Sequence, residues 1–136
     1  MLALDYGERR VGVAVCDASR TFVFGRETVM RAGAGAEFAA IARVCQDDGI
    51  RVVVVGLPIN ADGSEGGSAR VARAFAARVR EATGLPVLMV DERYTTIEAD
   101  ELLQQRFRDW RERKTRVDQA AATLILRTFL EHGAVG

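Results

Sequence analysis

The run IRVVVVGLP, residues 50–58, is apolar at nearly every position. A strand with one wet face alternates apolar and polar residues, whereas an uninterrupted apolar run is typical of a strand buried on both faces. We therefore expect this segment to be a central strand of a sheet. Other strands must lie beside it, and helices must cover it.

Three β-rich runs precede this strand and are joined by short connections, which favours an antiparallel meander. The runs are LALDYG (2–7), RVGVAVCD (10–17) and TFVFGRETVMR (21–31). After them, predicted helices alternate with predicted strands: helix 33–49, strand 50–58, helix 68–84 and strand 85–93. Helical crossovers imply that the later strands pair in parallel. We predict an α/β fold with a five-stranded mixed sheet, its first three strands antiparallel, flanked by helices.

Each predicted helix has an apolar stripe and ends at a glycine. In helix 33–49 the stripe consists of Phe38, Ile41, Val44 and Cys45. In helix 68–84 it consists of Val71, Ala74, Phe75, Arg78 and Val79. We expect both stripes to face the sheet.

The C-terminal part of the chain contains two more predicted helices. Thr95 and Glu98 form a capping-box pattern that begins a helix running to about Arg106. The segment VDQAAATLILRTFLEH, residues 117–132, has helical periodicity. Between them, RFRDWRERKTR (106–116) is polar and lacks apolar periodicity, so we predict a mobile loop there.

Length and composition exclude several classes of protein. The chain has 136 residues, and we expect 1–136 to be a single domain. No apolar run approaches the roughly 18 residues of a membrane span, and no secretory signal precedes the first strand, so we expect a cytoplasmic location. Cys16 and Cys45 lack the spacing of a zinc or redox motif, and His132 is the sole histidine. Any catalysis must therefore use carboxylates.

Three acidic positions interrupt segments that should otherwise be apolar. Asp5 lies inside the first strand, the pair Asp91 and Glu92 ends the last strand, and Asp118 shares a helical stripe with apolar residues. The residues that complete this stripe are Ala121, Ala122, Ile125 and Phe129. Taken singly, Asp91 fits a turn and Asp118 fits a helix N-terminus stabilised by the macrodipole. If the acids meet at one sheet edge, their mutual repulsion calls for cations.

Carboxylate oxygens are the ligands that Mg²⁺ and Mn²⁺ prefer. Two such ions, held about 3.5 to 4 Å apart, stabilise both the attacking and the leaving oxygen of a phosphodiester. The acids therefore favour metal-assisted phosphodiester hydrolysis.

Two segments have features that suit nucleic acid. GLPINADGSEGG (56–67) is a glycine-rich turn leading into a helix, which can receive a phosphate or can simply be a flexible turn. The segment 106–116 has six cationic and two anionic residues, a local charge of +4, with aromatic residues interleaved. Cations neutralise phosphates and aromatic rings stack on unpaired bases, which favours a single-stranded or branched ligand. A solvated charged loop is the alternative reading.

From these segments we select the candidate nucleic-acid contacts. In the basic segment they are Trp110, Arg111, Arg113, Lys114 and Arg116. Arg10 and Arg93 are close in sequence to proposed metal ligands and could meet phosphates, or could be ion-pair partners of nearby acids.

Four blocks of the sequence resemble the YqgF/RuvX family of Holliday junction resolvases and pre-16S rRNA nucleases. They are LALDYGERRVGVAVCD, VVVVGLPINADGSEG, VLMVDERYTT with the following EA, and VDQAAATLIL. The resemblance implies a ribonuclease H-like fold in which Asp5, Glu92 and Asp118 are the metal-binding catalytic acids, with Asp91 a weaker candidate. It further implies that Asn60 and Gly63 lie close to the nucleic-acid backbone.

The resemblance implies a substrate in the 5′ region of precursor 16S rRNA, with branched junction DNA as the second candidate. Symmetric cutting of a junction would call for a homodimer, which the sequence does not reveal. Two other classes stay open. DYGERRVGVAV is similar to the first phosphate motif of the actin and hexokinase superfamily, which would make the chain a nucleotide-binding module. The third class is a non-catalytic RNA-binding factor in ribosome assembly.

Overall fold

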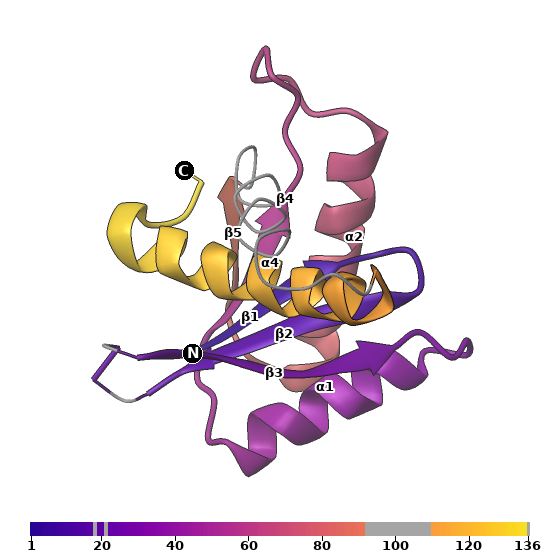
Figure 1. Ribbon diagram of the computed structural model, residues 1–136, viewed down its shortest axis with the longest axis vertical. Coiled ribbons are helices and arrows are strands. Elements are labelled where there is room, and N and C mark those ends of the chain that lie inside the picture. Colours follow the sequence, from indigo (N-terminus) through magenta and orange to yellow (C-terminus); the bar gives the residue numbers. More distant parts are fainter. Residues whose placement is uncertain (18, 21, 92–109, 136) are drawn as a thin grey trace.

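The computed structural model describes residues 1–17, 19–20, 22–91 and 110–135, and within 110–120 it describes the backbone (Figure 1). The strands are β1 (Leu2–Tyr6), β2 (Arg10–Cys16), β3 (Val23–Met30), β4 (Val53–Leu57) and β5 (Val87–Asp91). The helices are α1 (Ala36–Asp47), α2 (Gly67–Thr83) and α4 (Trp110–His132).

The five strands form one mixed sheet in the order β3-β2-β1-β4-β5. The first three are antiparallel neighbours, whereas β4 pairs in parallel with both β1 and β5. Every residue of β4 is buried, as its uninterrupted apolar sequence predicts. The predicted α/β architecture is confirmed.

Helices cover both faces of the sheet, and alternate residues of each strand point to opposite faces. On one face, α1 and α2 pack on Leu2, Leu4, Val53 and Val55. On the other, α4 lies across the sheet and packs on Ala3, Ala14, Val54 and Val90 (Figure 1). We call these the α2 face and the α4 face.

The stripe predicted for α1 is confirmed, but the one predicted for α2 is partly wrong. Phe75 and Val79 are buried, whereas Val71, Ala74 and Arg78 are exposed. The residues that face the sheet are Ala69, Ala72, Phe75, Ala76 and Val79. Alanines let α2 approach the sheet closely, and the predicted stripe left out Ala69, Ala72 and Ala76.

The loop predicted over 106–116 is wrong from residue 110 onward, because α4 begins at Trp110. Residues 106–109 lie outside the described residues, as does the helix predicted from Thr95. Arginine, glutamate and lysine are strong helix formers, and a helix that extends past the core needs no apolar stripe. The missing periodicity was therefore poor evidence for a loop.

Cys45 is buried in the α2-face core, and burial raises the pKa of its thiol. Cys16 is partly buried against the α4-face core, and neither cysteine is in a disulfide. In the part of the chain that the structure describes, no helix is both long enough and apolar enough to cross a membrane.

We predict that Ile125→Ala lowers the free energy of unfolding by about 2 to 5 kcal/mol, because Ile125 is fully buried between α4 and the sheet. Urea denaturation would measure the change. Val71→Ala on the exposed side of α2 is the control, with an expected change within roughly 0.5 kcal/mol. Equal losses for the two variants would contradict the described packing of α4.

Candidate active site at the carboxyl edge of the sheet

The carboxyl ends of β1, β4 and β5 lie at the same edge of the sheet, because these strands are parallel. Asp5 is the fourth of the five residues of β1, and Asp91 is the last residue of β5. In open α/β sheets, ligands bind in the crevice beyond this edge. Two of the predicted acidic positions therefore reach the edge at which a ligand is expected.

Asp5 lies on the α4 face and is half-buried. Ala3, two residues earlier in β1, packs in the α4-face core, and alternate residues of a strand share a face. On β2 the residue opposite Asp5 is Gly12, which has no side chain to cover the carboxylate. An acid can therefore occupy this apolar strand without being sealed in the core.

Asp91 lies on the other face. Val90 packs in the α4-face core, whereas Met89 packs against the α2-face core, so Asp91 shares the face of Met89. The structure therefore separates Asp91 from Asp5 by the thickness of the sheet. Glu92 and Arg93 lie outside the described residues.

Asp118 lies in α4, more than two turns after the helix begins at Trp110. The influence of a helix macrodipole falls off within the first turn, so it does not account for an acid at this position. Ala121, Ala122 and Ile125 are buried against the sheet, and helical spacing assigns residue 118 to the same stripe. The side chain of Asp118 is not among those described.

Among the described side chains, no group of three histidine, cysteine, aspartate or glutamate residues could hold a metal ion. The predicted trio includes Glu92 and the side chain of Asp118, which fall outside that set. The metal site therefore stays a prediction. Its one described member, Asp5, offers the hard oxygen ligands that Mg²⁺ and Mn²⁺ prefer.

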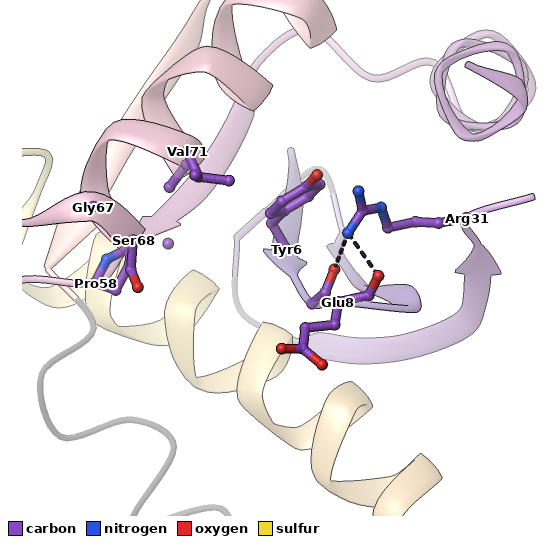
Figure 2. A pocket seen from close by; sticks show the side chains of 10 residues that line it. Tyr6, Glu8, Arg31, Pro58, Gly67, Ser68 and Val71 are labelled. Atoms are coloured by element: carbon purple, nitrogen blue, oxygen red, sulfur yellow. Dashed lines mark hydrogen bonds between the residues drawn. The ribbon is translucent and has the colours of Figure 1, made fainter. Parts of the chain in front are cut away.

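A pocket of about 620 Å³ opens at the same edge of the sheet, between the β1–β2 hairpin and the first turn of α2 (Figure 2). We call it the hairpin–α2 pocket. It is lined by Tyr6, Gly7, Glu8, Arg31, Gly56, Pro58, Gly67, Ser68, Val71 and Ala72. Tyr6 and Gly7 follow Asp5 directly in the chain, so the pocket adjoins the strand end that carries the carboxylate.

Arg31 braces one wall of the pocket. Its Nη1 donates hydrogen bonds to the backbone oxygens of Gly7, at 2.9 Å, and Glu8, at 2.7 Å (Figure 2). Its guanidinium carbon lies 4.5 Å from the centroid of the Tyr6 ring, within the range of a cation–π interaction. The hairpin itself is tight, since a Cβ at Gly7 would lie 2.7 Å from the backbone oxygen of Arg10.

Sequence reasoning missed Arg31, which is one arginine among many and belongs to no motif. The one signal was its position as the last residue of the third β-rich run, which an antiparallel meander brings next to the β1–β2 hairpin. Arg10, which was predicted, is the first residue of β2 and is half-buried.

Asn60 and Gly63 lie in the loop between β4 and α2, which is closed by its own hydrogen bonds. The Gly63 N–H donates a hydrogen bond to the backbone oxygen of Asn60 at 2.8 Å, and the Asn60 side-chain amide donates one to Ser64 Oγ at 3.1 Å. Gly63 has φ 87°, a left-handed conformation that favours glycine. In this conformation the Gly63 amide is already used within the loop, and contact with nucleic acid stays a prediction.

Asp62 fastens the same loop. One oxygen of its carboxylate accepts hydrogen bonds from the Ser64 hydroxyl, at 2.6 Å, and the Ser64 N–H, at 2.9 Å. These bonds favour the charged form and lower the pKa of Asp62 below its ordinary value of 3.8. Because the pKa is lowered in the folded state, the charged Asp62 carboxylate stabilises the loop at pH values above 3.8. This stabilisation is lost as the pH falls through the folded-state pKa.

The N-terminus of α2 faces the hairpin–α2 pocket, since Gly67 and Ser68 are among the pocket residues. Its N-cap residue, Gly66, has no side chain with which to cap the helix. Just before it, Glu65 accepts two hydrogen bonds from Arg73, at 2.6 and 2.9 Å, and this interaction lowers the pKa of Glu65. The Glu65 carboxylate is therefore paired with Arg73 beside this helix end.

Five of the predicted nucleic-acid contacts lie in the first two turns of α4. They are Trp110, Arg111, Arg113, Lys114 and Arg116. They occupy the same helix as Asp118, so the basic segment is joined rigidly to the position of the proposed third acid. Their side chains are not described.

We predict that Ser64→Ala raises the pKa of Asp62 toward its ordinary value, because the variant removes the hydroxyl that hydrogen-bonds to the carboxylate. An NMR titration of the carboxyl carbon would measure it. Ser64→Thr keeps a hydroxyl and should keep the lowered pKa. The same pKa in the alanine variant as in the parent protein would contradict the described loop.

Known proteins resemble this chain in sequence and in fold. Two relatives are both named "Putative pre-16S rRNA nuclease". The one from Thermosynechococcus vestitus is 40% identical over 131 residues, 96% of this chain and 87% of that protein. The one from Anaeromyxobacter dehalogenans is 42% identical over 133 residues, 98% of this chain and 97% of that protein.

A solved structure of T. thermophilus RuvC in complex with a Holliday junction substrate matches with a TM-score of 0.58, covering 98% of this chain and 96% of that one. At 15% sequence identity this likeness concerns the fold alone, and it agrees with the expected ribonuclease H-like fold. Residues 1–132 match the family model RuvX, described as Holliday junction resolvase. The chain therefore belongs to the RuvX family.

Proposed function

We propose that this protein is a metal-dependent endonuclease that hydrolyses phosphodiester bonds, and that its substrate is the 5′ region of precursor 16S rRNA. The observation that carries the proposal is the half-buried carboxylate of Asp5, at the carboxyl edge of the sheet and opposite Gly12, in a chain of the RuvX family. The name shared by the two relatives supports the choice of RNA.

In this proposal, Asp5, Glu92 and Asp118 hold Mg²⁺ or Mn²⁺ through carboxylate oxygens. When bound, a pair of such ions supplies an activated water and stabilises the leaving oxygen. The placement of Asp5 supports this role, because its carboxylate is only half-buried and faces α4, the helix that contains Asp118. Asp91 lies on the opposite face of the sheet from Asp5, which disfavours Asp91 as a ligand of the same ions.

In this proposal the cationic residues bind the sugar–phosphate backbone of the substrate. Arg10 begins the strand opposite β1, and the basic residues of α4 precede Asp118 on the same helix. Guanidinium groups bind phosphate oxygens with paired hydrogen bonds, which would fix the strand relative to the acids.

Cleavage of branched DNA is the second candidate, and the description of the family as Holliday junction resolvase favours it. Two symmetric cuts would require two active sites, so this function implies a homodimer. RNA cleavage needs no such assembly. The oligomeric state under cleavage conditions therefore helps to separate the two candidates.

We predict that Asp5→Asn, Glu92→Gln and Asp118→Asn each reduce Mn²⁺-dependent cleavage by orders of magnitude while the fold persists, because an amide cannot supply an anionic ligand. Single-turnover cleavage and thermal unfolding would be measured together. Asp91→Asn is the matched control and should cleave normally, since Asp91 lies on the other face of the sheet. Full activity in all three test variants would refute the proposed acids.

The substrate is tested with a panel of precursor 16S rRNA, four-way junction DNA and single strands, each with Mg²⁺, with Mn²⁺ or with chelator. We expect cleavage of the precursor RNA that disappears with chelator. Preferred cutting of the junction by a dimer would favour the second candidate. Metal-independent cleavage would contradict the proposal. Absence of cleavage, combined with RNA binding that Asp5→Asn leaves unchanged, would indicate a non-catalytic factor, whereas ATP binding would indicate a nucleotide-binding module.

We predict that neutralising Arg111, Arg113 and Lys114 flattens the salt dependence of RNA binding. The slope of log K against log salt should fall by about 0.7 for each lost contact to a single strand, or about 0.9 for a duplex. Arg80→Gln, an exposed residue in the last turn of α2, is the control variant. A slope that stays the same in the triple variant would remove this segment from the binding surface.

A further inference from the structure

We infer that the hairpin–α2 pocket binds one unpaired nucleotide of the substrate strand, adjacent to the bond that is cut. The inference rests on the proposed function for its place in the reaction, although binding in this pocket does not itself require cleavage. The pocket volume of about 620 Å³ falls within the roughly 300 to 1,000 Å³ of sites that hold small organic ligands.

The polar wall of the pocket suits a phosphate. The first turn of α2 brings Gly67, the Ser68 hydroxyl and the positive end of a 17-residue helix to one side. The guanidinium of Arg31 lies on the opposite side, fixed by two backbone oxygens and the Tyr6 ring. Arg31 Nε is buried and has no hydrogen-bond partner among the described residues. A cation therefore faces a helix N-terminus across a space that an anionic group can enter.

The apolar wall suits a base. Val71 is 52% exposed although it is a large aliphatic residue, and Figure 2 shows it on the same side of the pocket as Ser68 and Pro58. Across the pocket from Val71, the Tyr6 ring packs on Phe75, with ring centroids 4.2 Å apart (Figure 2). Bases that leave their stack pack against apolar and aromatic side chains and arginine planes. This role accounts for the apolar side chain of Val71 on the solvent side of α2.

Glu8 also lines the pocket, and its carboxylate disfavours a phosphate placed beside it. The phosphate is therefore expected at the Ser68 side and the base nearer to Glu8, where a carboxylate can accept hydrogen bonds from an exocyclic amino group. A base within a duplex is stacked and paired and cannot enter a pocket without being extruded. The site therefore selects an unpaired nucleotide.

Fluorescence anisotropy of a labelled short single-stranded RNA, in chelator to prevent cleavage, tests the inference. Val71→Asp should weaken binding about tenfold, which corresponds to the loss of one base contact, and Val71→Lys should strengthen it. Ala74→Asp adds the same charge to an exposed position of the same helix outside the pocket lining and should change binding little. A duplex of the same sequence should respond equally weakly to Val71→Asp and Ala74→Asp.

Because Val71 is largely exposed, neither substitution should unfold the protein, and thermal unfolding would verify this. Equal effects of Val71→Asp and Ala74→Asp on the single strand would overturn the pocket, and so would equal effects of Val71→Asp on single strand and duplex. These results would leave the proposed nuclease function standing. Conversely, full cleavage by all three acid variants, Asp5→Asn, Glu92→Gln and Asp118→Asn, would refute the proposed acids and would leave the result on binding in the pocket unchanged.

Discussion

The parallel pairing of β1, β4 and β5 is the constraint on which the proposed site depends. Because all three strands run the same way, segments far apart in the sequence end at one edge of the sheet. The pairing register then decides which residues lie opposite one another on neighbouring strands, and the pleat decides which of their side chains point to the same face of the sheet. A shift of one residue in β1 would move Asp5 from the α4 face to the α2 face. The apolar contacts of Leu2 and Leu4 with the α2-face core fix this register and so hold the carboxylate in place.

The two faces of that edge differ in chemistry. On the α4 face, Asp5 lies opposite a glycine and below the helix that contains Asp118. On the other side, the β1–β2 hairpin and the first turn of α2 form a pocket with cationic and apolar walls. Tyr6 and Gly7 connect the two regions within consecutive residues of the chain. In our proposals the α4 face holds the metal ions, the pocket holds a neighbouring nucleotide, and a single strand crosses the edge between them.

Much of the fold could be predicted because strand and helix periodicity report local burial. This periodicity predicted the three antiparallel runs, the buried strand β4 and the stripe of α1. Two predictions were wrong because apolar periodicity alone identifies neither the buried face of a helix nor every segment that is helical. In α2 the alanines Ala69, Ala72 and Ala76 face the sheet, and the bulkier Val71 does not. In α4 the charged residues after Trp110 are helical without any apolar stripe, since their helix propensity suffices when the rest of the helix is anchored on the sheet.

The sequence by itself determined the order of the elements, the unusual position of Asp5 in an apolar strand and the choice of carboxylates for any catalysis, because these follow from residue type and spacing. Only the tertiary structure decided that Asp91 lies on the opposite face from Asp5 and that Asp118 is too far inside α4 to serve its N-terminus. It alone also brought Arg31 to the hairpin and placed it across a pocket from the N-terminus of α2. Such relations depend on strand register and on packing between distant segments, and no local pattern in the chain encodes them.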